Sequence, residues 1–444
     1  MSEALIIGGG LAGLAAARAL GERAHLLEAS DRLGGLARTD VVDGFWFDWT
    51  GHWLHLRTAR WRAEAARLLP GGLLTVERQA RIFSHGVWTR FPFQVNTFGL
   101  PPEVVSECLQ GFIQATVGPE GATLRSREPR TFREFVLRYL GEGIARHFME
   151  PYNRKLYCVD TAELSADWGG RFVPRPTLAE VVDGAVGRVR EGLGYNATFV
   201  YPKEGGIESL ARALAAELTG PVSLGARVEH VRTAEHRVRL ADGRELEYEQ
   251  LLSTMPLKAL CSALDPLPDS VRAAAAALRS VSVTTVELGV KGPPRVPFHW
   301  AYVPEERFPF YRVGSPSQVN PGLAPPDHTS YAVEHSHLGP PPDPARTIDG
   351  AVRGLEAMGV LRRSDLVLAR ARTIPTAYVL VDHAYAEARR TIVDHLAAQG
   401  IELAGRYGLW EYSGMEDALL SGESAVERIL AKLERSTEAK VAAY

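Results

Sequence analysis

A glycine-rich turn near the N-terminus constrains the fold more than any other feature. The apolar run Ala4–Ile7 leads into Gly8-Gly9-Gly10, and Gly13 follows inside a segment of helical periodicity that lasts to Gly21. A strand, a G-x-G-x-x-G turn and a helix in this order are typical of a dinucleotide-binding βαβ unit. The glycines let the backbone approach a pyrophosphate at the helix N-terminus, where N–H groups and the helix dipole favour anions.

An acidic residue and a second glycine pair follow at the expected distance. His25 to Glu28 predicts the second strand, and the Glu28 carboxylate is placed to accept from a ribose hydroxyl. Farther on, Gly34-Gly35 can bring the backbone close to a diphosphate, and the Arg38 guanidinium can reach its charge or the edge of a flavin. The chain is therefore predicted to bind a dinucleotide.

The composition of the chain argues against several other classes of protein. The 444 residues include 45% hydrophobic ones, enough for a sizeable core, and a net charge of -3 without like-charged blocks gives no basis for a nucleic-acid surface. Cys108, Cys158 and Cys261 lack the spacing of a disulfide framework or a metal site. No metal is expected. With no apolar stretch long enough for a membrane span and no basic leader, a cytoplasmic protein is the expectation.

The segment from Ser30 to Thr39 resembles the GG-x-x-R-[ST] signature of flavin amine oxidases, protoporphyrinogen oxidases and UDP-galactopyranose mutases. This resemblance implies FAD as the cofactor. Val200–Leu210, Leu252–Pro256 and Gly414–Ala418 extend it along the chain, and the last of these implies a helix N-terminus near the flavin pyrimidine. The resemblance implies FAD contacts at Gly8, Gly10, Leu11, Ala12, Gly13, Glu28, Ala29, Arg32, Gly34, Gly35, Leu36, Ala37, Arg38, Gly51, His52, Val228, Val231, Met255, Gly405, Arg406, Met415, Glu416, Asp417 and Ala418.

The expected fold class is α/β, with a Rossmann-type FAD-binding domain, a helical insertion and a mixed β-sheet substrate domain. Thr131–Leu140 has one apolar side and predicts a helix, whereas Val281–Val290 predicts a strand. The expected boundaries are 1–95, 199–280 and 376–444 for the FAD-binding segments, 96–198 for the helical insertion and 281–375 for the β-rich substrate domain.

Several segments resemble the mutases more closely than the oxidases. Phe47–His55 resembles the mutase segment whose histidine backs the flavin, and Thr131–Ser165 follows the mutase pattern. His52 and Arg312 are the catalytic candidates implied by this resemblance. Strand alternation predicts that Phe310 and Arg312 share a face opposite Tyr311. The implied substrate-binding residues are Tyr152, Tyr157, Arg171, Arg175, Tyr311, Arg312, Trp410 and Tyr412.

These candidates also have structural interpretations. His52 could be a polar residue of a glycine turn, Arg171 and Arg175 could be surface charges, and any one of the aromatic residues could simply pack. One departure from the mutase pattern affects function: Glu411 stands between Trp410 and Tyr412, where mutases carry a second arginine that grips the diphosphate. An acid there is expected to oppose a phosphate group, at a cost of several kcal/mol in a dry site.

The leading functional hypothesis is a mutase-like enzyme that interconverts pyranose and furanose forms of a nucleotide sugar. The resemblance implies that reduced flavin acts as the nucleophile, so an electron donor for the flavin is also expected. An FAD-dependent oxidoreductase of the amine oxidase or protoporphyrinogen oxidase type is the alternative, and Glu411 favours it. A flavin-binding protein without catalytic activity is a third hypothesis.

Overall fold

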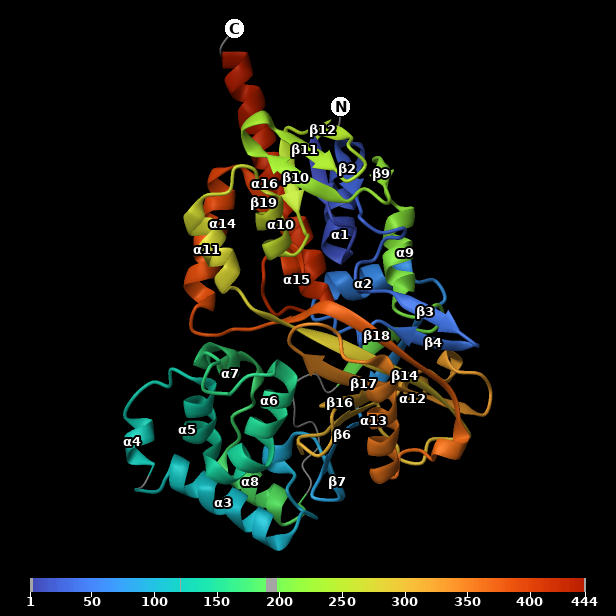
Figure 1. Ribbon diagram of the computed structural model, residues 1–444, viewed down its shortest axis with the longest axis vertical. Helices are drawn as coiled ribbons and strands as arrows, with labels where there is room; N and C mark the ends of the chain where they lie inside the picture. Colours follow the sequence, from blue (N-terminus) through green and yellow to red (C-terminus); the bar gives the residue numbers. More distant parts are fainter. Residues whose placement is uncertain (1–2, 120, 189–197, 443–444) are drawn as a thin grey trace.

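The computed structural model describes residues 3–119, 121–188 and 198–442, and within these the side chains of residues 170–172 and 436–442 are not described. The part expected to bind FAD lies at the top of Figure 1, a large sheet crosses the middle, and a group of helices lies at the lower left. Both termini lie at the upper end. None of the described helices combines the length and apolar composition needed to cross a bilayer.

The upper part is built on a parallel sheet with the order β19-β13-β1-β2-β9 among the described strands. The strand β1 is buried along its whole length, as a central parallel strand must be when helices cover both faces. The strands of this sheet are β1 (Ala4–Ile7), β2 (Ala24–Leu27), β9 (Val222–Ser223), β13 (Gln250–Ser253) and β19 (Ile401–Leu403).

Helices from three separate parts of the chain pack around this sheet. They are α1 (Leu11–Leu20), α2 (Ala59–Leu68), α9 (Glu208–Ala216), α10 (Leu257–Ala263), α11 (Asp269–Ala277), α14 (Tyr385–Ala398), α15 (Gly405–Gly408) and α16 (Met415–Ala442). The helices α1 and α16 approach closely, because a Cβ on Gly422 would lie 2.2 Å from the carbonyl oxygen of Ala12. A small antiparallel sheet of β10 (Val228–Arg232), β11 (Arg237–Leu240) and β12 (Glu245–Glu247) completes this part, with a turn at Asp242-Gly243 between the last two strands.

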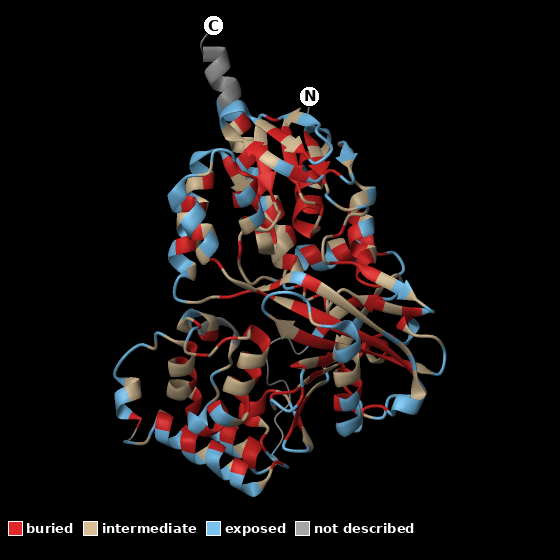
Figure 2. Ribbon diagram, in the orientation of Figure 1, coloured by how far each residue is buried: buried red, intermediate tan, exposed pale blue. Residues whose placement is uncertain are grey.

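The second large sheet is mixed and has the order β18-β14-β17-β16-β15-β6-β7 within the described residues. The strand β14, next to the edge strand in this order, contains the predicted strand Val281–Val290, and its buried residues appear as red ribbon in the middle of Figure 2. The strands are β6 (Ala80–Ser84), β7 (Val87–Arg90), β14 (Ser280–Lys291), β15 (Trp300–Tyr302), β16 (Arg312–Gly314), β17 (His328–His337) and β18 (Leu366–Val379).

Two of the expected boundaries differ from the membership of this sheet. Residues 80–90, expected in the first FAD-binding segment, form β6 and β7 and pair with β15. The strand β18 also continues past residue 375 to Val379. Sequence patterns locate strands but not their partners, so a strand pair far from β14 in sequence could not be assigned to its sheet.

The helical insertion contains α3 (Pro102–Thr116), α4 (Ala122–Arg125), α5 (Phe132–Ile144), α6 (Glu150–Tyr157), α7 (Ala166–Phe172) and α8 (Leu178–Ala185), with a π-helical turn at Ala145–Met149. The predicted helix α5 begins at a capping box in which Thr131 and Glu134 bond each other's backbone N–H groups. Its buried face joins a core with Phe112, Phe148 and Tyr152. The insertion thereby brings α6 against the second sheet.

Short elements connect these parts. They are β3 (Thr39–Val42) with β4 (Phe45–Asp48), β5 (Leu73–Glu77) with β8 (Thr198–Pro202), α12 (Pro316–Val319), α13 (Pro344–Ala357) and 3₁₀ turns at Gly21–Arg23, Phe93–Val95, Thr233–Glu235, Pro321–Leu323 and Arg363–Asp365. The hairpin β3–β4 matters most for the site, because it connects the Gly34–Thr39 loop to the segment that carries His52.

Candidate active site and cofactor site

The glycine turn between β1 and α1 forms an open cradle. A Cβ on Gly13 would lie 1.9 Å from the carbonyl oxygen of Gly8, so this glycine is needed for packing. A Cβ on Gly10 would meet only the Cα of Gly35, at 3.7 Å, and would therefore project into the space beside the turn. The backbone N–H of Gly34 bonds the carbonyl of Gly9 at 2.8 Å and brings the second glycine pair alongside the first.

The Glu28 carboxylate organises the other end of this cradle. It accepts from the backbone N–H of Gly9 and of Ser30, each at 2.8 Å. Arg38 is buried and donates to the Ser30 hydroxyl and the Arg32 carbonyl, while its Nε has no hydrogen-bond partner among the described residues. Burial lowers the pKa of Arg38, which fits a cation that is completed by an anionic ligand. The donor set and the free space fit the diphosphate of a dinucleotide.

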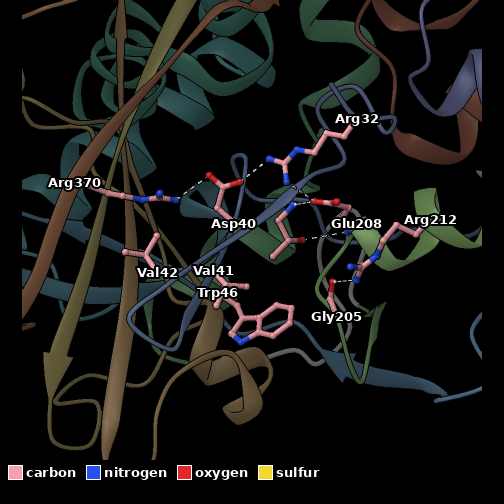
Figure 3. A pocket seen from close by; sticks show the side chains of 10 residues that line it. Arg32, Asp40, Val41, Val42, Trp46, Gly205, Glu208, Arg212 and Arg370 are labelled. Atoms are coloured by element: carbon pink, nitrogen blue, oxygen red, sulfur yellow. Dashed lines mark hydrogen bonds and ion pairs between the residues drawn. The ribbon is translucent and has the colours of Figure 1, made fainter. Parts of the chain in front are cut away.

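Arg32 does not face this cradle. It donates to Asp40 at 2.7 Å and to Glu208 at 3.3 Å, and Figure 3 shows it among the charged residues of a separate hollow of about 390 Å³. Asp40 also accepts from Arg370 at 3.2 Å. Two carboxylates thus hold the Arg32 guanidinium, and a contact of Arg32 with FAD stays a prediction.

The loop after β4 presents His52 next to the start of α16. The backbone N–H groups of Arg57 and Thr58 donate to Glu416 at 2.7 and 2.9 Å, which ties this loop to the helix N-terminus. Glu416 thus supports the loop with its side chain, and a contact of Glu416 with FAD stays a prediction. Asp417 similarly accepts from the backbone N–H of Gly414 at 2.8 Å.

His52 is neutral at physiological pH. Burial lowers its pKa to about 4, and the positive charges of Arg406 and Arg312 act in the same direction. The buried Nδ1 has no hydrogen-bond partner among the described residues. A neutral imidazole with an unused nitrogen suits a position against a planar ring. A Cβ on the neighbouring Gly51 would lie 3.1 Å from the Trp300 ring, so a side chain there would crowd that indole.

The other predicted cofactor residues surround the cradle or the core behind it. A Cβ on Gly405 would lie 2.9 Å from Ala12, so Gly405 is required where α15 approaches α1. Val231 is fully buried, and its carbonyl accepts from the N–H of Asp265 at 3.1 Å. The remaining residues of this group lie at the α1 start, in the segment after β2, in the edge strand β10, after β13 or at the α16 start: Leu11, Ala12, Ala29, Gly35, Leu36, Ala37, Val228, Met255, Met415 and Ala418.

Arg312 forms a buried ion pair with Glu334, its cross-strand neighbour between β16 and β17. The Nη2 to Oε2 distance is 2.5 Å, and the side chains are 12% and 3% exposed. Burial lowers the pKa of Arg312, but Glu334 outweighs this effect and the pKa lies above its usual range. The guanidinium also stacks on Trp300 with its carbon 4.3 Å from the ring centroid.

The predicted alternation of side chains around Arg312 is wrong. Tyr311 and Arg312 both contact Glu334, whereas Phe310 belongs to the core beneath α13. The strand β16 begins only at Arg312, so the preceding residues do not follow strand alternation. Arg312, Glu334 and Gly51 also line a small cavity of about 20 Å³.

Aromatic side chains from all three parts of the fold meet beside this pair. Trp168 lies 5.3 Å from Tyr157 and 5.0 Å from Tyr412, and Tyr378 stacks on Tyr412 at 6.1 Å. Tyr152 packs edge-on against Tyr311 at 6.1 Å. The Tyr157 hydroxyl is buried without a hydrogen-bond partner among the described residues. Together these rings form a wall that can exclude water from a bound ligand.

Arg406 lies inside this wall without an acidic partner in the described part of the chain. Its guanidinium carbon is 4.5, 5.3 and 5.7 Å from the rings of Tyr412, Tyr378 and Tyr407. Its Nη1 and Nη2 donate to the carbonyls of Ser413 and Ala377 at 2.9 and 3.0 Å, and its buried Nε has no partner. The positive charge is therefore available to a ligand.

Three further predictions for the substrate site are corrected or lie outside the description. Trp410 is 1% exposed and packs in the core between α14 and the parallel sheet, so it does not line the site. Arg175 is exposed and stacks on Tyr139 of α5, 3.9 Å from its ring centroid. The side chain of Arg171 lies outside the described residues. Glu411 contacts Arg389 at 3.4 Å, so its charge is compensated by α14.

Sequence reasoning missed Glu334 and Tyr378. The Tyr378 hydroxyl accepts from Arg312 at 3.1 Å, and the Tyr378 ring covers Arg406. Glu334 directly follows the apolar run Tyr331-Ala332-Val333 of β17, and an acid at that position is the signal that could have identified it, since a buried carboxylate needs a partner.

The parallel sheet, the two glycine turns and the acid at the end of β2 together define an FAD-binding flavoprotein. Residues 11–430 match a model of the flavin containing amine oxidoreductase family, and the chain belongs to that family. A polyamine oxidase 5 of Oryza sativa subsp. japonica is 48% identical over 54 residues, which is 12% of this chain and 11% of that protein. The match thus spans about a ninth of that relative.

Solved structures resemble almost the whole chain. A reduced UDP-galactopyranose mutase has a TM-score of 0.90 and 26% identity, and the match covers 97% of this chain and 96% of that one. A protein described as a putative protoporphyrinogen oxidase from Exiguobacterium sp. 255-15 has a TM-score of 0.71 at 20% identity, covering 97% and 98%. A fatty acid isomerase from P. acnes has a TM-score of 0.64 at 14% identity, covering 96% and 98%. The last two show the fold alone.

Proposed function

We propose that this chain is an FAD-dependent enzyme of the UDP-galactopyranose mutase type, which interconverts the pyranose and furanose forms of a nucleotide sugar. The observation that carries this proposal is the state of Arg406. Its guanidinium lies among Tyr378, Tyr407 and Tyr412 and has no carboxylate partner in the described chain. It is also close enough to His52 to lower the pKa of that imidazole.

The charges of the site favour an anionic ligand. Glu334 compensates Arg312, and Arg389 contacts Glu411, which leaves Arg406 as the cation whose charge is not balanced locally. In a site walled by aromatic rings, an anion gains from this charge, whereas a protonated amine is repelled. The tyrosine rings around Arg406 could hold an ammonium group, but the guanidinium already occupies that position.

The structural similarity supports the same assignment. The reduced UDP-galactopyranose mutase is matched at a TM-score of 0.90 and 26% identity. FAD, when bound and reduced, supplies an electron-rich N5 for attack on an anomeric carbon. The chain itself has two tasks: holding the phosphate groups and excluding water from the reacting centre.

Named residues can be given to these tasks. Arg406 attracts the anion, and Arg312 can add one hydrogen bond from the donors that Glu334 leaves free. The unpartnered hydroxyl of Tyr157 can bond a sugar or ribose hydroxyl. Neutral His52 backs the flavin without adding a charge that would compete with the phosphates. Arg171 remains a candidate for additional charge from the helical insertion.

An oxidoreductase of the amine oxidase type is the second candidate, and membership in the flavin containing amine oxidoreductase family favours it. Glu411 no longer favours this candidate, because its carboxylate contacts Arg389. An amine oxidase reaction requires a neutral or cationic amine beside the flavin. The unbalanced charge of Arg406 opposes the cationic form.

Equilibrium binding separates the two candidates. UDP and benzylamine would be titrated against the oxidised holoenzyme and against Arg406→Gln, with flavin fluorescence as the readout. We expect UDP to bind the wild type and to bind Arg406→Gln about tenfold or more weakly, because one charge-assisted contact is lost. Tight benzylamine binding with no UDP binding would overturn the proposal. Arg353→Gln, whose exposed ion pair with Asp349 lies on α13, is the matched control.

A further inference from the structure

A turn at the edge of the candidate site is held from behind by α14. Arg389 donates through Nε to the Leu409 carbonyl at 2.6 Å and through Nη2 to Glu411 at 3.4 Å. The Tyr385 hydroxyl donates to the Trp410 carbonyl at 2.7 Å. Two side chains of a single helix thus make hydrogen bonds to three consecutive residues of the turn.

The turn has an unusual backbone. Trp410 has a φ of 51°, in the left-handed region that a bulky L-residue rarely adopts, and its indole is buried in the core beside α14. Such a conformation is strained and persists when its surroundings determine it. The contacts from Arg389 and Tyr385 provide such surroundings.

The same turn determines where Arg406 lies. The N–H of Glu411 donates to the Arg406 carbonyl at 2.9 Å, and Arg406 Nη1 donates to the Ser413 carbonyl at 2.9 Å. The next aromatic residue, Tyr412, covers the guanidinium. A change in the conformation of the turn would therefore move both the cation and the ring that covers it.

We propose that Arg389 is a positioning residue of the anion site: it holds the Trp410–Glu411 turn in place and neutralises the Glu411 carboxylate. This rests on the proposed function only in taking the anion to be a nucleotide diphosphate. In this chain an acid occupies the position between the two aromatic residues, and Arg389 on α14 makes that acid compatible with a bound phosphate. Glu411 serves as an attachment point for the turn.

Because the Arg389–Glu411 pair is partly exposed, its loss should affect ligand binding and protein stability to different extents. Arg389 and Glu411 are 29% and 41% exposed, so the ion pair itself adds little to the free energy of unfolding. A Glu411 carboxylate released from Arg389 would nevertheless add a negative charge next to the ligand phosphates. Loss of Arg389 should therefore reduce anion binding more than it reduces stability.

The test compares Arg389→Gln, Glu411→Gln, the double variant and Arg389→Lys. FAD content, the dissociation constant for UDP and the midpoint potential of the bound flavin would be measured for each. We expect Arg389→Gln to keep its FAD, to bind UDP about 5- to 20-fold more weakly and to have a more negative midpoint potential, since a free carboxylate disfavours electron uptake. Glu411→Gln and Arg389→Lys should stay within twofold of the wild type for UDP.

The double variant discriminates between neutralisation and general support. Removing the carboxylate as well as its partner should restore most of the UDP affinity and the midpoint potential. Equal losses in Arg389→Gln and the double variant would overturn the neutralisation of Glu411 by Arg389, and unchanged values in Arg389→Gln would overturn both parts of the proposal. If the wild type binds no UDP, the proposed function fails, but the midpoint potentials still decide the role of Arg389. Arg428→Gln, which removes an ion pair to Glu402, is the control and should leave every value unchanged.

Discussion

Arg312 and Glu334 face each other across neighbouring strands and form an ion pair that is almost completely buried. The Tyr311 hydroxyl also donates to the same carboxylate. This arrangement makes Arg312 both a candidate ligand of the substrate and a structural partner of Glu334, and the two roles have different consequences on substitution.

Arg312→Gln should destabilise the protein by about 3–5 kcal/mol, because it leaves the Glu334 carboxylate buried without its cation. Unfolding in urea, followed by circular dichroism, measures this loss. The control is Arg353→Gln on the exposed surface, which should change the free energy of unfolding by less than about 1 kcal/mol. Equal effects of the two substitutions would contradict the buried pair.

Gly10→Val should fold normally and lose FAD. A Cβ at this position meets only the Cα of Gly35, at 3.7 Å, so the added side chain would occupy the space of the cofactor diphosphate. Gly13→Val should instead fail to fold, since its Cβ would lie 1.9 Å from the Gly8 carbonyl oxygen. Absorbance of bound flavin together with the far-ultraviolet circular dichroism of each variant provides the measurement. A yellow, fully loaded Gly10→Val protein would refute this assignment of the cradle.

His52→Ala should retain FAD but change the flavin absorption spectrum and its rate of reduction by dithionite. The UDP dissociation constant should stay within about twofold of the wild type. Because burial lowers the pKa of His52 to about 4, the imidazole stays neutral above pH 5. The midpoint potentials of wild type and variant, plotted against pH from 5 to 8, should therefore run parallel. An effect confined to UDP binding, with an unchanged flavin spectrum, would place His52 in the substrate pocket.

Asp48 should make stability depend on pH. Burial raises its pKa to about 6, although Thr39 and Tyr201 donate hydrogen bonds to it. The folded state therefore keeps the Asp48 proton at pH values where the unfolded chain has released it. This favours the folded state at pH 4 and is lost as the pH rises through about 6.

Relative to Asp48→Asn, the wild type should thus lose up to about 3 kcal/mol of unfolding free energy between pH 4 and 6. Urea unfolding of both proteins at intervals of half a pH unit gives the difference in their unfolding free energies. The contributions of the other titrating groups cancel in this difference. Parallel curves for the two proteins would show that Asp48 is already ionised at low pH in the folded state.

The sequence predicted the parts of the fold that depend on local patterns. The glycine spacing identified the β1–α1 turn and Glu28, and the capped amphipathic segment after Thr131 became α5. FAD as the cofactor followed from the resemblance of the Ser30–Thr39 segment to flavoprotein signatures, and the family match agrees. In these cases the residues that specify the structure are close together in the chain.

Contacts between distant segments could not be predicted in the same way. Glu334 stands 22 residues from Arg312, and only the pairing of β16 with β17 brings them together. Arg389 reaches Glu411 from a helix whose packing the sequence does not specify. For this reason the sequence predicts a substrate-binding Arg312 without identifying its acidic partner, and it predicts that Glu411 opposes the substrate without identifying Arg389.

The central claim is that this flavoprotein rearranges a nucleotide sugar without net oxidation. The most direct measurement is anaerobic incubation of dithionite-reduced and oxidised enzyme with UDP-galactopyranose and UDP-galactofuranose, with separation of the two ring forms by chromatography. Benzylamine and spermine would be incubated with oxidised enzyme in parallel. We expect interconversion only with the reduced enzyme, an unchanged flavin redox state after turnover, and no flavin reduction by either amine. Flavin reduction by an amine, with no change in the ring form of either sugar, would contradict the claim.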